Sequence, residues 1–233
     1  MNGLTLITPT GNRPQALKLC TLFVNRQDWA GPLQWIVVDD GTPPDDIYVR
    51  AGIELSHILP SPSWRPGQNT QARNLLVAIP EVRYDKVVIV EDDDRYSVDY
   101  CHIMAGELDS CALVGDPDSR YYHLSTRQWR VMKNSCAASL CQTAMRSEKL
   151  PALERACLDR PDCIDGSLWT SEHKSAHLIR YEGCVGMKGM PGRTGIGTGH
   201  QPQRQPEKWN PDTNLQVLRS WIGDDVDLYQ EFL

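Results

Sequence analysis

The sequence predicts an α/β fold with a mostly parallel sheet, helices on both faces of that sheet, and a mixed, partly antiparallel C-terminal extension. Strand-like and helix-like segments alternate over the first hundred or so residues, which indicates βαβ units with right-handed crossovers. The run Lys86–Val90 (KVVIV) is almost wholly apolar, as strands buried on both faces are. After about residue 110, short strand-like segments follow one another instead.

The first βαβ unit is predicted from residue types and spacing. Residues 4–8 (LTLIT) are apolar and β-branched and end at Pro9, which favours a buried strand followed by a turn. Apolar positions then recur at helical spacing up to Val24, and Pro14 suits the first turn of that helix. The run Gln34–Val38 favours the second strand.

The same order of elements then repeats. A short strand is expected near His57–Leu59, a helix over Thr70–Ile79, and the apolar strand Lys86–Val90 after it. Ligands of open α/β sheets bind beyond the carboxyl ends of the strands, so the residues that follow the strands should converge on one site. The segments expected there are Thr8–Gly11, Asp39–Gly41 and Glu91–Asp94.

The second half of the chain is predicted to extend the first rather than to form a separate domain. A helical stretch at Glu148–Leu158 and a final helix around Thr213–Trp221 are expected, with a long Gly- and Pro-rich loop, Gly183–Pro211, between them. The strand-like segments before them are Ala112–Val114, Tyr121–Leu124, Trp129–Met132 and Ala138–Cys141.

Composition excludes several classes of protein. Hydrophobic residues make up 40% and charged residues 23%, which is ordinary for a globular chain and unlike a disordered one. A net charge of -6 excludes a polybasic binder of nucleic acid or membranes. With no long apolar segment and no basic-flanked apolar leader, a cytoplasmic protein is expected. The eight widely spaced cysteines are expected to be reduced and mostly to be packing residues, with a structural zinc site as the alternative.

Four consecutive acids, Glu91–Asp94, follow the apolar strand Lys86–Val90. Packing carboxylates together raises the cost of ionising each of them unless a cation offsets their charge. Mg²⁺ and Mn²⁺ take oxygen ligands, commonly one or two carboxylates together with substrate phosphates. The pattern therefore predicts a divalent metal site. The alternative is a solvated acidic turn in which Asp94 or Ser97 caps a helix.

A second acidic pair, Asp39-Asp40, follows Gln34–Val38 and is expected beside the first. A carboxylate there can accept a hydrogen bond from a base N–H or from a ribose hydroxyl. Arg13 and Arg73 could supply positive charge to phosphates or pair with these acids. A surface salt bridge is the alternative for both arginines.

The segment Met187–His200 (MKGMPGRTGIGTGH) is rich in glycine and carries Lys188 and Arg193. Glycine lets the backbone approach a ligand closely, and the two cations suit phosphate oxygens. We therefore expect a mobile lid over a diphosphate, with a plain flexible loop as the alternative. His200 could be a metal ligand, although a lone histidine is more often only hydrogen-bonded.

Transfer of a group to a hydroxyl requires a general base. Asp165 is the candidate, with Glu172 and His173 as alternatives. The Asp165-Gly166 pair is equally consistent with an ordinary turn.

Residues 119–134 combine four cations and three aromatic residues of the Tyr and Trp types without an acid. Such a combination suits phosphates and stacked bases. The other interpretation is a pair of strands with basic outer faces and an aromatic core.

Three blocks, ITPTGNRPQAL, IVVDDGTPP and VVIVEDDDRYSVDY, resemble in order and spacing those of family 2 glycosyltransferases with the GT-A (Rossmann-like) fold. The resemblance covers roughly residues 4–100. It implies a nucleotide-sugar donor, most often UDP-linked, bound with Mn²⁺ or Mg²⁺ at an Asp-x-Asp-type motif. Glu91-x-Asp93 and Asp92-x-Asp94 both fit that motif, and Asp93 is the first choice.

Individual roles follow from the residue pattern and the resemblance together. We expect the metal ligands to be Asp93, Asp94 and His200, since many enzymes of the family use a C-terminal histidine. In the family, the catalytic carboxylate usually belongs to a pair of acidic residues. Asp165 departs from this pattern because it is followed by Gly166. The expected nucleotide-sugar-binding residues are Thr8, Thr10, Arg13, Asp39, Arg73, Asp92, Lys188 and Arg193.

The SRYYHL and GMPGRTGIGTGH blocks are also similar to phage-encoded glycosyltransferases that modify hydroxymethylated pyrimidines in DNA. The prediction is one domain over 1–233, with a nucleotide-sugar half (1–110) and an acceptor half (111–233) that holds the loop 183–211. Its expected activity is metal-dependent, inverting transfer to an acceptor hydroxyl, in the host cytoplasm if the chain is phage-encoded. The alternatives are a sugar-nucleotide nucleotidyltransferase and a non-catalytic nucleotide- or nucleic-acid-binding module.

Overall fold

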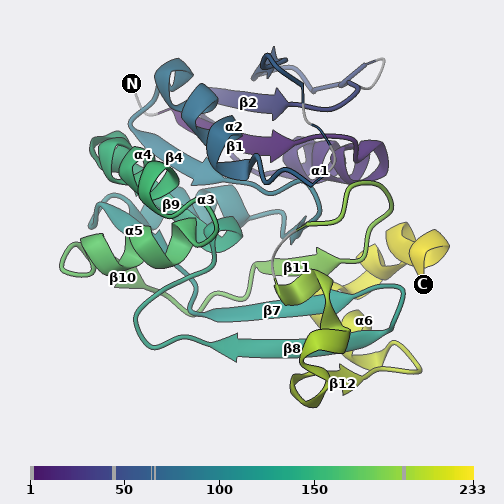
Figure 1. Cartoon of the computed structure of the whole chain (residues 1–233). Coiled ribbons are helices and arrows are strands. Elements are labelled where there is room, and N and C mark those ends of the chain that lie inside the picture. The colour runs from purple at the N-terminus through teal and green to yellow at the C-terminus, as the bar shows by residue number, and fades with distance from the viewer. Residues whose placement is uncertain (1–2, 44–45, 64, 66, 196–197) are drawn as a thin grey trace.

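A seven-stranded sheet forms the centre of the computed structural model, which describes residues 3–43, 46–63, 65, 67–195 and 198–233. In spatial order its strands are β10 (Ala176–Leu178), β6 (Leu113–Gly115), β9 (Thr143–Arg146), β4 (Lys86–Ile89), β1 (Leu4–Thr10), β2 (Leu33–Asp39) and β3 (Ile53–Ile58). The strands β4, β1, β2 and β3 are mutually parallel, and β9 runs antiparallel to β4 and β6 (Figure 1). The predicted mostly parallel sheet is confirmed.

Helices cover both faces of this sheet, because successive side chains of each strand point to opposite faces. Leu6 of β1 packs in one core cluster with residues of α1 (Pro14–Arg26) and α3 (Tyr100–Glu107). Its neighbour Ile7 packs in a second cluster with residues of α2 (Gln71–Ala78), α4 (Leu150–Asp159) and α5 (Ile164–Glu172). Each strand therefore contributes to two hydrophobic cores.

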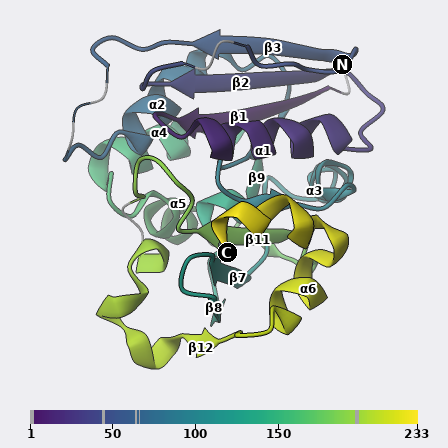
Figure 2. The same cartoon turned by 90° about the vertical axis from the view of Figure 1, so that its right-hand side faces the viewer.

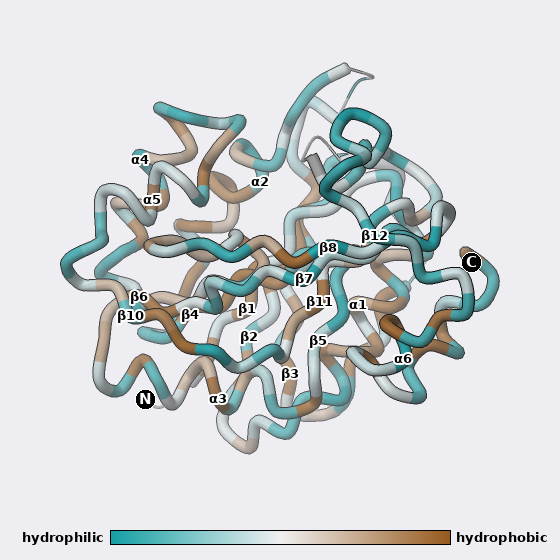
Figure 3. The backbone as a smooth tube through the Cα atoms, turned by 90° about the horizontal axis from the view of Figure 1, so that it is seen from below, coloured by the Kyte–Doolittle hydropathy of each residue, from teal (hydrophilic) through white to brown (hydrophobic). Residues whose placement is uncertain are grey.

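A smaller, five-stranded sheet carries the mixed pairing predicted for the second half. In spatial order its strands are β12 (Asn210–Pro211), β8 (Gln128–Lys133), β7 (Asp118–His123), β11 (Cys184–Lys188) and β5 (Arg95–Tyr96). The β7–β8 and β8–β12 pairs are antiparallel, β11 runs parallel to β7, and β5 is antiparallel to β11. Figure 3 shows hydrophobic stretches along the strands and hydrophilic segments on many outlying loops.

The chain ends in α6 (Gln216–Ile222) and a 3-10 helix, η7 (Gly223–Phe232). Val226 and Tyr229 of η7 are buried in the same core as α1. Asp225 binds Arg26 of α1 at 2.8 Å and Arg95 of β5 at 2.8 Å. Figure 2 shows this C-terminal segment between α1 and the strand β11. Residues near the end of the chain thus tie the two sheets together.

The described part of the chain also contains six shorter 3-10 helices: η1 (Ile79–Glu81), η2 (Leu140–Gln142), η3 (Ser147–Lys149), η4 (Thr198–His200), η5 (Pro202–Arg204) and η6 (Pro206–Lys208). None of the helices in the described residues has both the length and the apolar character needed to span a bilayer. The eight cysteines are all free. Five of them are buried, as expected of packing residues, whereas Cys136 and Cys163 are exposed.

The strand predicted over Ala138–Cys141 is wrong, because a turn occupies this stretch and the strand begins at Thr143. Two hydrogen bonds close the turn, from Gln142 N–H and Thr143 Oγ1 to the carbonyl oxygen of Ser139 (2.9 and 2.8 Å). The apolar residues are buried here because the turn packs into the core, where Tyr100 donates to the carbonyl oxygen of Cys141 (3.1 Å). The buried apolar residues of this turn therefore gave the sequence the same pattern as a buried strand.

The long loop predicted over Gly183–Pro211 is also wrong near its start, where Cys184–Lys188 form β11, between β7 and β5 in the smaller sheet. The remaining described part consists mainly of irregular chain and 3-10 turns. Ile196 and Gly197 of the glycine-rich segment lie outside the described residues. Two helices were not predicted, α3 and α5, and Asp165-Gly166 lies in the first turn of α5 rather than in a loop.

Candidate active site

A cavity of about 390 Å³ lies beyond the carboxyl ends of β1 and β4, between the central sheet and the smaller one. Thr10 and Arg13 line it after β1, and Glu91, Asp92 and Asp93 line it after β4. The other polar or charged residues of its wall include Asn69, Thr70, Gln71, Asn74, Tyr121, Asn134, Ser139, Asp162, Asp165, Lys188, Arg193 and His200. Most of the predicted site residues therefore come together in one place.

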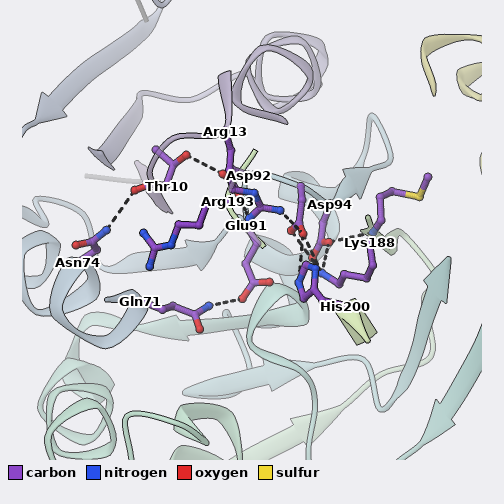
Figure 4. Close-up of polar contacts among 12 residues, drawn as sticks. Thr10, Arg13, Gln71, Asn74, Glu91, Asp92, Asp94, Lys188, Arg193 and His200 are labelled. Atoms are coloured by element: carbon purple, nitrogen blue, oxygen red, sulfur yellow. Dashed lines mark hydrogen bonds and ion pairs between the residues drawn. The ribbon is translucent and has the colours of Figure 1, made fainter. Parts of the chain in front are cut away.

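Asp92 is bound to the loop that follows β1. Its Oδ2 accepts a hydrogen bond from Thr10 Oγ1 at 2.7 Å, and its Oδ1 lies 2.7 Å from Arg13 Nη1. The other terminal nitrogen of Arg13 lies 2.6 Å from Asp93 Oδ2. Burial opposes charge on Arg13, but Asp92 and Asp93 raise its pKa above the ordinary value. One guanidinium thus bridges two neighbouring carboxylates, and Figure 4 shows Arg13 beside Asp92.

Asp94 points the opposite way, toward β11. Its Oδ1 lies 2.8 Å from Lys188 Nζ and accepts a hydrogen bond from the backbone N–H of Met187 at 3.1 Å. Lys188 Nζ also lies 3.4 Å from each oxygen of Asp93. Burial disfavours the charge of Lys188, yet Asp93 and Asp94 raise its pKa well above the ordinary value. Lys188 is therefore a charged ammonium inside the protein.

The four acids differ in how readily they ionise. Burial and the repulsion among the carboxylates together raise the pKa of Glu91 to about 8 and that of Asp94 to about 7, although the charge of Lys188 opposes both shifts. Burial acts on Asp93 as well, but Arg13 and Lys188 hold the pKa of Asp93 well below its usual range. Asp93 is the acid of this run whose negative charge its surroundings favour most clearly.

The residues of this cluster fit a hard divalent cation. Glu91, Asp93 and Asp94 each offer a carboxylate oxygen, and these atoms lie within 4.8 Å of one another. Asp94 Oδ2 is buried and has no hydrogen-bond partner among the described residues, so it could accept a further ligand. Carboxylate oxygens are the donors that Mg²⁺ and Mn²⁺ prefer.

His200 approaches the same cluster from η4. Its Nε2 lies 3.6 Å from Asp93 Oδ2. Burial and, after it, the charge of Lys188 lower the pKa of His200 to about 3, although Asp93 opposes this shift. The imidazole is therefore neutral, which is the form that binds a metal ion.

The second acidic pair lies behind the cavity wall. Asp40 is buried and binds Arg193 Nη1 and Arg73 Nη2, each at 2.9 Å, and it accepts a short hydrogen bond from Thr70. Arg193 also donates to Thr70 Oγ1 at 2.7 Å. Asp40 therefore holds the glycine-rich segment and α2 beside the loop after β1.

Three predicted donor-binding residues do not line the cavity: Thr8, Asp39 and Arg73. Thr8 is fully buried, and its hydroxyl accepts a hydrogen bond from Trp35 Nε1 at 2.9 Å. Asp39 accepts one from the N–H of Gly41 at 3.0 Å and lies 3.6 Å from His57 Nε2. Thr8 thus belongs to the core, and Asp39 and Arg73 lie outside the enclosed space.

The glycine-rich segment is docked on the loop between β1 and α1. The N–H of Arg193 donates to the carbonyl oxygen of Asn12 at 3.2 Å. Gly192 has a φ of +102°, and a Cβ atom there would lie 2.4 Å from the same carbonyl oxygen. Only glycine fits this close approach in that backbone conformation.

Asp165 reaches the cavity from the first turn of α5. Its Oδ1 accepts a hydrogen bond from the N–H of Gly166 at 2.8 Å. Burial raises the pKa of Asp165 above the ordinary aspartate value. The alternatives Glu172 and His173 do not line the cavity, and Glu172 binds Lys149 at 2.7 Å.

The basic and aromatic stretch 119–134 forms the β7–β8 hairpin, as one of its two interpretations predicted. Its faces are not simply basic outside and aromatic inside. Arg130 is buried with its guanidinium over the ring of Trp209, and Arg120 lies over Trp221. Tyr121 is part of the cavity wall.

Sequence reasoning missed the polar residues of α2 that face the cavity. Gln71 Nε2 donates to Glu91 Oε1 at 2.7 Å, and Asn74 Nδ2 donates to the carbonyl oxygen of Thr10 at 3.3 Å. The two side chains are one helical turn apart, so they share a face of α2. A search for polar residues at that spacing near the start of the helix could have found them.

Comparison with known proteins identifies the fold. No family model matches the sequence, and no curated protein matches it. Solved structures do match: Staphylococcus aureus TarS, with 13% identity and a TM-score of 0.55, and residues 1-349 of TarS in complex with UDP, with 12% identity and a TM-score of 0.54. The mannosyltransferase PcManGT from Pyrobaculum calidifontis, in complex with GDP-Man and Mn²⁺, matches with 17% identity and a TM-score of 0.52.

These matches cover 79%, 79% and 78% of this chain, respectively. They span only 36%, 60% and 56% of the three matched chains. At such low identities the likeness identifies the fold alone. The chain has the GT-A glycosyltransferase fold, as the sequence blocks predicted.

Proposed function

We propose that the protein is a metal-dependent, inverting glycosyltransferase that moves a sugar from a nucleotide sugar to an acceptor hydroxyl. A UDP-sugar is the first donor that we expect. One observation carries this proposal: Glu91 and Asp93, cations that suit a diphosphate, and the partly buried Asp165 line a single cavity. Asp94, the third acid that suits a divalent cation, does not line the cavity but lies next to Glu91 and Asp93. The GT-A fold and the nucleotide and nucleotide-sugar complexes of its structural neighbours support it.

The donor would lie along the carboxyl ends of β1 and β4. Arg13, Lys188 and Arg193 line the cavity and could meet the diphosphate oxygens. Glu91, Asp93, Asp94 and the neutral His200 would hold Mn²⁺ or Mg²⁺, with Glu91-x-Asp93 as the favoured register because Asp92 faces Arg13 and Thr10. Such an ion, when bound, would offset the negative charge of the leaving nucleoside diphosphate.

Asp165 would act as the general base. The acceptor oxygen would attack the anomeric carbon while the bond from that carbon to the diphosphate oxygen breaks, and Asp165 would take the hydroxyl proton. Nucleoside diphosphate then leaves with the bonding electron pair, and the anomeric configuration inverts. Arg13 and Lys188 would stabilise the negative charge that develops on the leaving group.

The acceptor would enter on the side of β7, β8 and α5. The first acceptor to test is the hydroxymethyl group of a modified pyrimidine in DNA. This choice rests on the similarity of the SRYYHL and GMPGRTGIGTGH blocks to phage-encoded glycosyltransferases that act on such DNA. Tyr121 in the cavity wall could stack on a base. The exposed cations Lys133 and Arg160 adjoin in sequence the cavity-lining residues Asn134 and Pro161 and could meet backbone phosphates.

The test is a mass-spectrometric screen of nucleotide sugars against hydroxymethylated DNA and against simple sugar acceptors, with Mn²⁺ present. Release of nucleoside diphosphate together with a glycosylated acceptor is the expected result. Release of diphosphate from a nucleoside triphosphate would favour the nucleotidyltransferase alternative instead. A non-catalytic binding module would show no donor turnover and would keep its binding in Asp165→Asn.

A further inference from the structure

We propose that Lys188 is a built-in counter-ion of the acidic cluster, which has to leave Asp93 and Asp94 before a divalent cation binds there. Metal and nucleotide then bind cooperatively, because the donor diphosphate offers the displaced ammonium a new partner. This inference rests on the proposed function, since it requires a metal site at the acids after β4.

The ammonium of Lys188 occupies the position of a cation. Its Nζ lies 2.8 Å from Asp94 Oδ1 and 3.4 Å from both oxygens of Asp93. The lysine is 4% exposed, so water screens these charges poorly. Asp94 is also fixed by the N–H of Met187, which keeps its Oδ1 directed at β11. Figure 4 shows Lys188 extending to Asp94 from the strand.

The oxygens that Lys188 contacts belong to the residues that would bind the metal. Glu91, Asp93 and Asp94 form the group whose oxygens lie within 4.8 Å of one another. A divalent ion among them would lie close to the ammonium in a poorly screened interior, where two positive charges repel strongly. The free protein should therefore bind metal weakly as long as Lys188 stays in place.

The side chain of Lys188 has space for a second position, in the cavity. It lines the cavity, and its Nζ lies 5.7 Å from the centre of the Tyr121 ring, which also faces the cavity. Its alkyl chain runs past Gly199, where even a Cβ atom would be only 3.2 Å from Lys188 Cγ. With no side chain at that position, the lysine can turn toward the space in which a donor diphosphate would lie.

The test compares Mn²⁺ binding by the wild type and by Lys188→Met, by titration calorimetry, with and without UDP. Without UDP, the variant should bind Mn²⁺ about tenfold more tightly or better, because a repelling charge is gone. UDP should tighten Mn²⁺ binding markedly in the wild type and much less in the variant. Mn²⁺ should also raise the melting temperature of the variant more than that of the wild type.

The matched control is Lys86→Met. Lys86 is a partly buried lysine that, like Lys188, is paired with an aspartate (Asp109, at 2.7 Å), but it lies at the opposite end of β4 from the acidic cluster. This variant should bind Mn²⁺ as the wild type does. A gain in affinity that Lys86→Met shares would overturn the inference, since general loss of positive charge would then explain it.

Equal Mn²⁺ affinities of the wild type and Lys188→Met without UDP would overturn the inference and leave the proposed metal site intact. Failure of both proteins to bind Mn²⁺ under any condition would instead contradict the metal-dependent function itself. Should Lys188→Met not fold, the wild type decides alone: the inference fails if UDP does not tighten Mn²⁺ binding by about tenfold.

Discussion

Among the residues of the acidic run, Asp93 is the one best suited to bind a cation. Arg13 lies 2.6 Å from it and Lys188 3.4 Å, and together they hold its pKa well below the usual range despite burial. Glu91, by contrast, has a pKa of about 8, because burial disfavours its charge. Asp93 is therefore charged throughout the neutral pH range, while Glu91 ionises readily only when a cation offsets it.

Asp93→Asn should abolish Mn²⁺-dependent release of UDP from UDP-sugars, with a loss of about a hundredfold or more, because the amide removes the negative charge at the centre of the cluster. The measurement is a coupled assay of UDP release. Asp109→Asn, which alters an exposed aspartate paired with Lys86, should keep wild-type turnover. Undiminished turnover in Asp93→Asn would refute the metal role of this residue.

Asp165→Asn should lower kcat by about a hundredfold to ten-thousandfold, the usual range for a general base. A base must be ionised, so activity is present above the pKa of Asp165 and is lost as the pH falls through it. Because burial raises that pKa, the acid limb of the wild-type profile should lie above the ordinary aspartate pKa of about 4.

The variant should lack this acid limb, whereas Asp159→Asn, at an exposed position near the end of α4, should keep it. The check is the pH dependence of kcat/KM over the acid range. If Asp165→Asn kept both the rate and the acid limb, another group would have to be the base.

At the level of elements, the cavity depends on segments that are held by a few specific contacts. The glycine-rich segment is docked through Gly192 and Arg193, and β11 is docked through Met187 and Lys188. The helix α2 closes the opposite wall. Each of these elements carries its site residues at or near one end, so small shifts of an end would move charges relative to the donor.

Gly192→Ala should raise the KM for the nucleotide sugar, because its Cβ would push Arg193 and the whole segment away from Asn12. It should also destabilise the fold by about 1–2 kcal/mol, since alanine is disfavoured at positive φ. The measurements are KM from initial rates and the free energy of unfolding in urea.

Gly52→Ala is the matched control, because Gly52 has a φ of +90° but no atom within 4 Å of the position that a Cβ would take. It should share the loss of stability and leave KM unchanged. Equal KM values for the two variants would show that the contact with Asn12 does not position the donor site.

At the scale of the whole molecule, the C-terminal segment joins the two sheets. Asp225 forms ion pairs with Arg95 of the smaller sheet and with Arg26 of α1, the helix that packs on the central sheet. Arg95 is 15% exposed at its side chain and Arg26 46%, so the pair with Arg95 is the less screened of the two. Leu4 near the start of the chain and Tyr229 near its end also belong to the same hydrophobic core.

Asp225→Asn should lower the free energy of unfolding by about 1–3 kcal/mol, mainly through the charged hydrogen bonds of Arg95. Urea denaturation followed by fluorescence measures this change. Asp224→Asn, an exposed neighbour, should have little effect. Equal stability of the two variants would mean that Asp225 does not hold the segment in place.

Much of the fold could be predicted because it depends on local pattern. The strands β1, β2 and β4 can each be predicted from an apolar run within about ten residues. The helices α1 and α2 can be predicted in the same way from apolar residues at helical spacing. The elements that were predicted wrongly are those whose conformation depends on contacts with residues far away in the chain. The strand β11 lies within a glycine-rich sequence and is stabilised by pairing with β7 and β5, which are distant in the chain.

The candidate site was predicted in part for the same reason. The acids after β4 follow directly from a strand and its end, so residues 91–94 and Thr10 could be expected at one sheet edge. Thr8 was misplaced because it lies within β1, two residues before the strand ends at Thr10, where its hydroxyl accepts a hydrogen bond from Trp35 inside the core. Gln71 and Asn74 were missed because their residue types alone do not set them apart, and only their shared helical spacing near the start of α2 could have indicated them.

Local residue pattern alone was enough for the parallel α/β arrangement and for an acid-rich strand end, since both follow from hydrophobic runs and what comes after them. Tertiary structure alone settled which acid meets which cation. Asp92 faces Arg13 and Asp94 faces Lys188, and these partners are 79 and 94 residues apart in the chain. Charge pairing over such separations depends on how sheets and loops pack, and the same packing sets the pKa values on which the site would work.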